Sequence, residues 1–436
     1  MLGGGSFTSL NAVLPGSYIN FVSAARAAER TGRGIVAIPF EMDWCEENKV
    51  FEITKGDFEK NALTILGYAA TDAKMKNFRE VFKNAQTLQA YRLNHGGNKA
   101  ENTFATANYT GIRGNDLKII ITVNVDDTDK FDVKTMLGDN LIDSQTVATA
   151  AGLVANEFVT FKSGATLAAT AGTALTGGTN GAAVIGSDYT TYLGAVEPYN
   201  FNVLAYPGGD DTTAKLFDNF TKRMRDELGI KFQLVRLATA TAPDHEGVIV
   251  VPNAVLDDGA PTGAIVYWLA GAQSACKINE SLTSAEYTGE YTVDVNYRQT
   301  QLTDFVNAGK LAFHKVGLSV RILTDINSFT SLTELKTKGF ASNQSIRVLD
   351  QIGNDQAALF NTKYLGKISG NDSGRTSFWS DVVTYMQTLE KNGAIQDFVP
   401  QTVAVEQGET RKQVVLNLTA TPTECMEQLY STVYVA

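Results

Sequence analysis

The sequence predicts a multidomain chain of α/β and β segments that lies between two extended terminal arms. Its 436 residues exceed the size of one ordinary domain. Its composition, 44% hydrophobic and 19% charged, is typical of a chain that folds around buried cores. Strand and amphipathic helix patterns are mixed in three segments, and a fourth segment carries strand patterns alone. The predicted segments are an arm (1–22), an N-terminal α/β domain (23–97), a β-rich insertion (98–186), a central α/β domain (187–335), a C-terminal α+β domain (336–420), and a helix start followed by a strand arm (421–436).

Glycine and proline mark the first arm. Gly3 to Gly5 and Pro15-Gly16 bracket it, and the residues that follow, 18–22, are strand-forming. In the N-terminal α/β domain the apolar spacing predicts helices and short strands. The strands are expected over 34–38 (ended by Pro39), 50–53 and 88–93, and the helices over 57–66 and 72–82.

The β-rich insertion is predicted from one strongly alternating strand over 117–125. Its apolar residues share one face, as the period of two requires. They are Leu117, Ile119, Ile121, Val123 and Val125. A second strand is expected over 157–161. Nearly every residue from 163 to 183 is Ala, Thr or Gly, so this tract is expected to be loop and domain boundary.

The central segment reads strand, amphipathic helix, strand, which implies a parallel sheet with helical crossovers. Strands are expected over 201–206, 231–237 and 247–251. Thr212 or Thr213 is expected to cap the helix after the first strand, and Gly229 to end it.

The last segment is mixed. Helices are expected over 345–360 and 377–389, and strands over 403–405 and 413–418. Thr421-Pro422-Thr423-Glu424 fits a helix start, with Thr as N-cap, Pro at the first helical position and Glu at the third. Residues 429–435 are strand-forming, which is unusual at a chain end because termini fray unless something holds them.

Charge and cysteine content narrow the function. The formal net charge of −10 argues against a protein that binds nucleic acid directly and without sequence preference. The opening residues lack a secretory pattern, and no apolar run is long enough for a membrane anchor. Cys45, Cys276 and Cys425 are far apart and suggest reduced thiols. We therefore expect synthesis in the cytosol.

No motif predicts a catalytic, cofactor-binding or metal-binding residue. His245-Glu246 would need a second histidine at position 249, which is isoleucine, so the zinc-protease motif is missing. There is also no G-x-S-x-G elbow. Gly177 to Gly181 favours a turn over a phosphate cradle.

Three charged groups leave two interpretations each. Asp126 to Asp129 favour a solvated strand end over a calcium site, because the remaining calcium-loop residues are missing. Asp210-Asp211 fit a ligand site after a strand or, with more support, the stabilisation of a helix N-terminus. Lys363, Lys367 and Arg375 form a basic stretch, either ordinary surface or a contact face for an acidic partner.

Several stretches, in order along nearly the whole chain, resemble the contractile tail sheath proteins of phages and phage-tail-like bacteriocins. The similarity begins at residues 14–21 and 34–39 and continues at 109–117 and 175–181. It is carried further by Ala270-Gly271-Ala272-Gln273, Asp325-Ile326-Asn327-Ser328, Tyr364-Leu365-Gly366-Lys367, Gly374-Arg375 and Asn392-Gly393-Ala394-Ile395. The resemblance implies that 98–186 is a β-sandwich, that the central domain is subtilisin-like, and that the C-terminal domain lies nearest an inner tube. It also implies a structural protein that is not an enzyme.

The resemblance further implies a sheath of stacked homohexameric rings, made in the bacterial cytoplasm and released in a tail or tail-like particle. Its implied partners are further copies of itself, the tail tube protein, and baseplate and tail terminator proteins. Each subunit would lend its arms as strands to neighbours. The implied strand residues are Tyr18, Ile19, Phe21, Val22, Tyr430, Val433, Tyr434 and Val435, and the implied tube-facing residues are Lys363, Lys367 and Arg375.

Three alternatives stay open at this point. Both tails could pair within their own subunit. The chain could be a different self-assembling shell or tube protein without contraction. The central α/β domain could also carry a hydrolase, although no Ser-His-Asp arrangement can be assigned.

Overall fold

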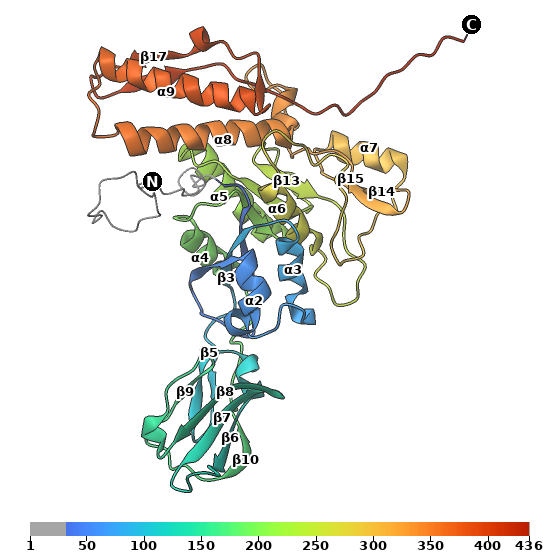
Figure 1. The fold of residues 1–436 in the computed structure, drawn as a ribbon. Helices are drawn as coiled ribbons and strands as arrows, with labels where there is room; N and C mark the ends of the chain where they lie inside the picture. Colours follow the sequence, from blue (N-terminus) through green and yellow to red (C-terminus); the bar gives the residue numbers. More distant parts are fainter. Residues whose placement is uncertain (1–31, 436) are drawn as a thin grey trace, which may run out of the picture. The chain divides into compact units, whose positions relative to one another are not determined.

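The structure, a computed structural model, describes residues 32–435 (Figure 1). Its centre is a six-stranded sheet in the order β13-β12-β11-β1-β3-β2. All neighbours are parallel except β2, which is antiparallel to β3. The strands are β1 (Ile35–Phe40), β2 (Val50–Thr54), β3 (Thr87–Arg92), β11 (Val203–Tyr206), β12 (Gln233–Leu237) and β13 (Val248–Val251).

Helices cover both faces of this sheet, so its strands are almost entirely buried. On one face, Val36, Ile38 and Phe40 of β1 share a core with residues of α2, α3 and α6. On the other face, Ala37 of β1 shares a core with residues of α4 and α5. The helices are α2 (Lys55–Leu66), α3 (Lys76–Phe82), α4 (Gly186–Val196), α5 (Asp211–Lys222) and α6 (Ile265–Ala275).

Two details of this sheet differ from the sequence analysis. Segments 23–97 and 187–335 were predicted as separate domains, but their strands lie in one sheet, because β1 pairs with β3 on one side and β11 on the other. Pro39 does not end β1 and instead pairs with Tyr91. Proline is tolerated there because the register of β1 with β11 covers only Val36 and Ala37, so Pro39 lies outside that ladder.

Residues 98–180 form two antiparallel sheets packed around one apolar core. The sheets are β10-β6-β7-β8 and β4-β5-β9. Their strands are β4 (Lys99–Glu101), β5 (Ala105–Thr110), β6 (Leu117–Val123), β7 (Phe131–Leu137), β8 (Asn140–Val147), β9 (Val159–Phe161) and β10 (Thr170–Ala174). Leu117, Ile119 and Ile121 are buried as predicted, whereas Val123 and Val125 are exposed because they lie at and beyond the end of β6. The small-residue tract was predicted as loop but contains β10, a mostly exposed edge strand that needs no bulky side chains.

The two-sheet domain joins the rest of the chain through a narrow neck. A Cβ added to Gly97 would lie 2.0 Å from the carbonyl oxygen of Thr179, and one added to Gly181 would lie 2.0 Å from that of His95. Only glycine permits this approach of the outgoing and returning segments. Trp44, which follows β1, is fully buried in the core of the two-sheet domain.

The C-terminal part packs two long helices against short β elements. These are α8 (Asn343–Leu359), which continues into a π-helical turn (Phe360–Tyr364), and α9 (Asp372–Lys391). The hairpin of β17 (Ala404–Gln407) and β18 (Val414–Asn417) lies beside α9, and β16 (Ile395–Gln396) pairs with β19 (Thr421–Pro422) (Figure 1). Between the central sheet and this part lie α7 (Gln299–Asn307), β14 (Phe313–Val316) and β15 (Ser319–Ile322) in chain order.

The helix predicted from Thr421 is wrong. Thr421 and Pro422 pair with β16, and the Thr423 N–H donates to the Ala394 carbonyl oxygen at 3.0 Å. The predicted third helical residue, Glu424, instead accepts a hydrogen bond from Ser345. Tertiary partners therefore replace the local capping pattern. The predicted fold class, a multidomain mixture of α/β and β parts with a β-sandwich, is confirmed.

Candidate functional site

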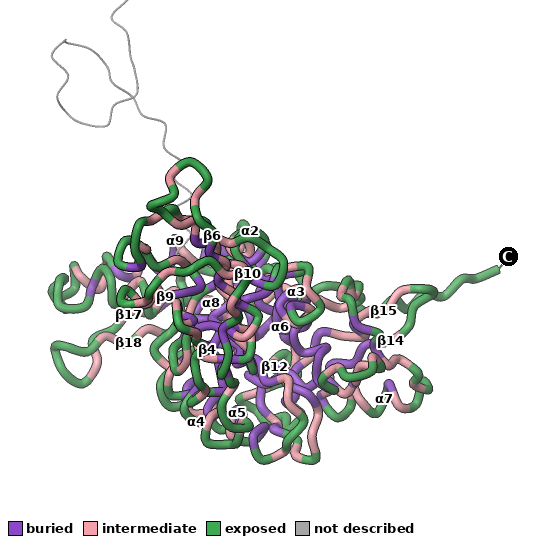
Figure 2. Tube along the Cα trace, turned by 90° about the horizontal axis from the view of Figure 1, so that it is seen from below, coloured by how far each residue is buried: buried purple, intermediate pink, exposed green. Residues whose placement is uncertain are grey.

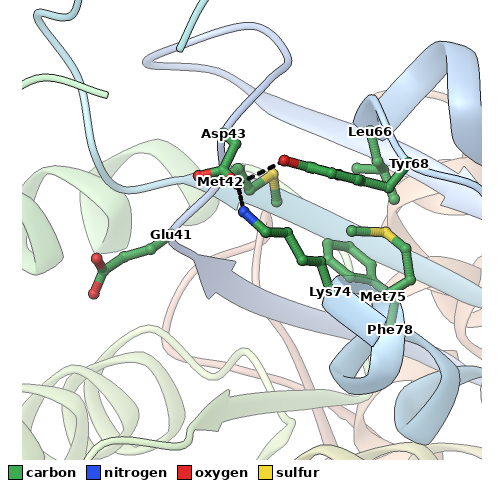
Figure 3. A pocket seen from close by; sticks show the side chains of 8 residues that line it. All are labelled: Glu41, Met42, Asp43, Leu66, Tyr68, Lys74, Met75 and Phe78. Atoms are coloured by element: carbon green, nitrogen blue, oxygen red, sulfur yellow. Dashed lines mark hydrogen bonds and ion pairs between the residues drawn. The ribbon is translucent and has the colours of Figure 1, made fainter. Parts of the chain in front are cut away.

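A pocket of about 260 Å³ opens beyond the carboxyl end of β1 (Figure 3). In open α/β sheets, ligands bind beyond the carboxyl ends of the strands where the strand order reverses. Here the chain runs from β1 to β2 and β3 on one side and later to β11 on the other, so β1 stands at such a point. The pocket is lined by Glu41, Met42, Asp43, Leu66, Tyr68, Lys74, Met75 and Phe78.

The one acid at the centre of this pocket is saturated with donors. Asp43 Oδ2 accepts from the Tyr68 hydroxyl at 2.8 Å and from the Lys74 ammonium, and Oδ1 accepts from the Asn180 amide at 2.8 Å. Burial alone would raise the pKa of Asp43, but the hydrogen bonds from Lys74, Asn180 and Tyr68 leave it lowered. Burial and the bond to Asp43 raise the pKa of Tyr68 to about 12. The lowered pKa makes Asp43 a weak base whose oxygens are already occupied, and the raised pKa makes Tyr68 a poor nucleophile.

Asp210 and Asp211 begin α5. Asp210, not Thr212 or Thr213, is the N-cap, and its side chain accepts from the Thr213 N–H at 2.7 Å. Lys215 and the Thr239 and Thr241 groups hold the pKa of Asp211 well below its ordinary value. The two acids serve the helix N-terminus, as the structural interpretation expected.

One mixed cluster of ligand atoms stands out in residues 32–435. The side chains of Asp226, His245 and Glu246 place atoms within 4.8 Å of one another. His245 Nδ1 accepts from the Gly247 N–H at 2.9 Å, so the ring proton sits on Nε2, which donates to Asp226 at 3.0 Å. A metal on Nε2 would move that proton to Nδ1, against the Gly247 N–H, and Glu246 is already paired with Lys336 at 2.6 Å. The cluster is better explained as a hydrogen-bonded junction than as a metal centre.

The C-terminal tail has a different character from these pockets. Residues 423–435 have no regular secondary structure, and the last of them run away from the domains (Figures 1 and 2). The predicted arm residues Tyr430, Val433, Tyr434 and Val435 are 81–93% exposed. Within residues 32–435 they form no strand pairing, and the Tyr430 hydroxyl donates only to the neighbouring Gln428 side chain at 3.0 Å. The other predicted arm residues, Tyr18, Ile19, Phe21 and Val22, lie outside the described residues.

Free strand edges occur close to the same end of the chain. The β17–β18 hairpin is a sheet of two strands, so within the described residues each strand has one unpaired edge. One face of this hairpin packs on the core of α8 and α9 through Val405, Val414 and Leu416. Exposed edges of this kind are ready templates for a strand from another chain.

The predicted basic residues are only partly brought together. Arg375, which pairs with Asp372, lines a pocket of about 340 Å³ together with Arg411, Lys412 and the apolar side chains of Phe378 and Val414. Lys363 pairs with Asp381 at 2.5 Å and lies in a separate hollow between α8 and α9. Lys367 donates to the Thr362 carbonyl oxygen at 2.6 Å. The sequence analysis missed Arg411 and Lys412, whose only signal was a basic pair in a hairpin turn.

Four family descriptions match consecutive parts of the chain. They are the tail sheath protein Gp18 domain III N-terminal region (33–93), the phage tail sheath protein beta-sandwich domain (83–180), the phage tail sheath protein central domain (182–328) and the phage tail sheath C-terminal domain (336–436).

Individual relatives agree with these matches. The chain is 35% identical to phage-like element PBSX protein XkdK of Bacillus subtilis (strain 168), with full coverage of both chains. Its sequence is 38% identical to that of the sheath tail protein from Desulfitobacterium hafniense. The crystal structure of that protein matches this fold with a TM-score of 0.82 over 94% of this chain and 98% of that one. The helical sheath of the anti-feeding prophage in its contracted state shares the fold, with a TM-score of 0.56 and 12% identity over 97% of this chain and 99% of that one.

Proposed function

This chain belongs to the phage tail sheath protein family, and on that premise we propose that it polymerises as stacked rings around a rigid tail tube and contracts to drive the tube through a target envelope. The observation that carries the proposal is an exposed, strand-forming tail in a chain whose β17–β18 hairpin has two edges that are unpaired within residues 32–435. A chain built in this way completes its sheets by adding strands from other copies.

The acceptor for a donated strand is the β17–β18 hairpin. Its inner face already rests on α9, so an added strand would continue a packed layer. The donated strands come from the two arms, with Tyr18, Ile19, Phe21 and Val22 at one end and Tyr430, Val433, Tyr434 and Val435 at the other. During contraction the domains rotate as bodies while the arms keep neighbouring subunits joined.

The role needs no catalytic residue, cofactor or nucleotide, because the energy is stored in contacts between subunits. None of the helices between residues 32 and 435 is both long and apolar enough to cross a bilayer. Assembly takes place in the bacterial cytoplasm with the tube, baseplate and tail terminator proteins, and the product leaves the cell as part of a tail or tail-like particle.

Electron microscopy of the purified protein tests the proposal. We expect helical tubes with a wide lumen in the absence of ATP, and no tubes after deletion of residues 1–22 or of residues 429–436. The replacement of Ser163 and Thr166 by alanine, two exposed residues in a loop of the two-sheet domain, is the control and should leave the tubes intact. Closed shells would favour the non-contractile alternative, and full-length protein that stays monomeric with a hydrolase activity would favour the enzyme.

The basic pocket carries the proposal for the tube-facing surface. Arg375, Arg411 and Lys412 surround an apolar hollow in the C-terminal domain, a combination that fits an acidic partner with an apolar side chain. We expect Arg375→Glu with Arg411→Glu to leave sheath polymers intact but to reduce co-sedimentation with the tube protein at least about tenfold, since charge reversal across an interface costs several kcal/mol. Lys134→Glu in the two-sheet domain is the control. Unchanged co-sedimentation of the double variant would refute the assignment.

A further inference from the structure

The C-terminal tail changes character at Gln428. Before that point several of its groups are held, although the Met426 side chain is fully exposed: the Thr423 N–H donates to the Ala394 carbonyl oxygen, and the Cys425 N–H donates to the Gln344 side chain at 3.1 Å. Beyond that point the side chains are open, with Leu429 90% exposed and Val435 93% exposed.

Two glutamates hold the first part of the tail, and they hold it to different parts of the molecule. Glu424 accepts from the Ser345 hydroxyl on α8 at 2.8 Å. Glu427 accepts from the Thr324 hydroxyl at 3.0 Å through one carboxylate oxygen and from the Thr283 hydroxyl through the other. The tail is thus tied both to the C-terminal helices and to the central domain.

The attachment continues into the interior. The Thr283 hydroxyl that donates to Glu427 also accepts from the Asp325 N–H at 2.9 Å. The Asp325 carboxylate pairs with Arg347 of α8 at 2.8 Å, and both side chains are 1% exposed. The outer hydrogen bonds therefore rest on a buried, rigid network.

Without these bonds the tail would be held by β16–β19, a ladder of two residue pairs, and by the single N–H bonds of Thr423 and Cys425. Hydrogen bonds of this kind contribute only about 0.5–1.5 kcal/mol each, so we expect a pull on the arm to break the two N–H bonds and then to open this short ladder. The free tail would also lengthen from seven residues, 429–435, to thirteen, 423–435. Effective concentration falls roughly as the −3/2 power of tether length, so this change alone lowers it roughly 2.5-fold.

We infer that Glu424 and Glu427 clamp the root of the arm, so that the segment offered to a second copy of the chain begins at Leu429. This inference rests on the proposed strand exchange for its partner. The clamp itself is a property of the single subunit. It fixes where the arm leaves the fold and carries the tension that a neighbour exerts on it.

Hydrogen exchange of the full-length subunit, diluted below its assembly concentration, tests the clamp directly. In the wild type, the Thr423 and Cys425 amides should exchange at least about tenfold more slowly than those of 429–435, because their N–H groups are bonded. Glu424→Ala with Glu427→Ala should speed exchange at Cys425 to the rate of the open tail. Glu334→Ala, which removes an exposed carboxylate from a loop, is the matched control.

Assembly followed by light scattering tests the consequence. The double variant should need at least about 2.5-fold more protein to polymerise than the wild type, and Glu334→Ala should match the wild type. Cys425 exchanging as fast as 429–435 in the wild type, or a double variant that assembles normally, would overturn the inference. Wild-type protein that shows the protection but never polymerises would overturn the proposed function and leave the clamp standing.

Discussion

The replacement Arg347→Met should weaken the contact between the C-terminal helices and the central domain, and so destabilise the protein. Arg347 lies on α8 and is 1% exposed. It donates to the Gln273 side chain at 2.7 Å, to the Glu280 carbonyl oxygen at 2.8 Å and to Asp325 at 2.8 Å. Methionine has a similar length, so the change removes the charge and the donors without leaving a large cavity.

The expected loss in free energy of unfolding follows from the buried Asp325 carboxylate that the replacement leaves without a counter-ion. Asp325 keeps hydrogen bonds from the Leu282 N–H, Gln273 and Asn343, but its buried negative charge loses its counter-ion. Removal of one partner of a buried pair costs roughly 3–5 kcal/mol, and we expect Arg347→Met to lower the free energy of unfolding by that amount. The double change with Asp325→Asn should cost at least ~1 kcal/mol less than the sum of the single changes, because no charge is left unpaired.

Urea unfolding followed by circular dichroism measures these differences, and their pH dependence identifies the cause. In the wild type, burial would raise the pKa of Asp325, but Arg347 and the neighbouring donors keep it lowered. In Arg347→Met the burial remains, so this pKa should rise above that of the unfolded chain. Protonation of Asp325 then removes the unpaired buried charge from the variant. The difference in free energy of unfolding between the variant and the wild type should therefore shrink as pH falls from 7 towards 5. A deficit below ~1 kcal/mol at pH 7, or one that does not change with pH, would refute the reasoning.

Three further predictions concern other parts of the chain. Burial lowers the pKa of His245, although two neighbouring carboxylates oppose this shift. The free energy of unfolding of the wild type should therefore fall as pH drops below about 6.5. In urea titrations between pH 5.5 and 7, His245→Asn should make the free energy of unfolding less dependent on pH. Gly111→Ala should cost at least ~2 kcal/mol in the same assay, because φ is 126° and the new Cβ would lie 1.9 Å from the Asp43 carbonyl oxygen. Gly138→Ala, with φ of 60° and open space, should cost only about 1–2 kcal/mol, and equal losses would contradict the steric argument. Thr54→Ala should cost about 1 kcal/mol, because Thr54 and Asp57 form a capping box at α2, and an unchanged melting temperature would contradict it.

Local patterns predicted most of the elements. The strand, helix, strand order of the central segment gave β11, α5 and β12 and their parallel pairing, because hydrophobic periodicity and glycine stops act within a dozen residues. The alternation from Leu117 to Ile121 likewise placed the buried face of β6.

Long-range pairing was out of reach of the same patterns. The Asn202 side chain accepts from the Gly34 and Ile35 N–H groups across more than 160 residues, and the sequence carries no signal for that contact. The unification of two predicted domains into one sheet is of this kind. At Thr421 the local capping signal competed with strand pairing to β16, and the tertiary contact won.

The candidate site also has one part that local sequence patterns predicted and one part that depends on long-range contacts. The strand-forming run that holds Tyr430 and Val433 was recognised from local residue types, and their assignment to an arm came from the family resemblance; the structure shows both side chains exposed. The pocket that joins Arg375 to Arg411 depends on how the hairpin folds over α9, and the sequence analysis placed only the first of the two.

The glycine neck at Gly97 and Gly181 makes the two-sheet domain a replaceable module. Because the outgoing and returning segments touch there, a linker of a few residues could bridge them without moving β3 or α4. A reporter, an affinity tag or a foreign binding domain could be grafted at this point and displayed at every subunit position. A guest domain would have to replace three contacts of the host: it would need an apolar site for the Trp44 indole, a donor for Asp43 in place of Asn180, and an acceptor for the buried Arg92 in place of the Thr110 carbonyl oxygen.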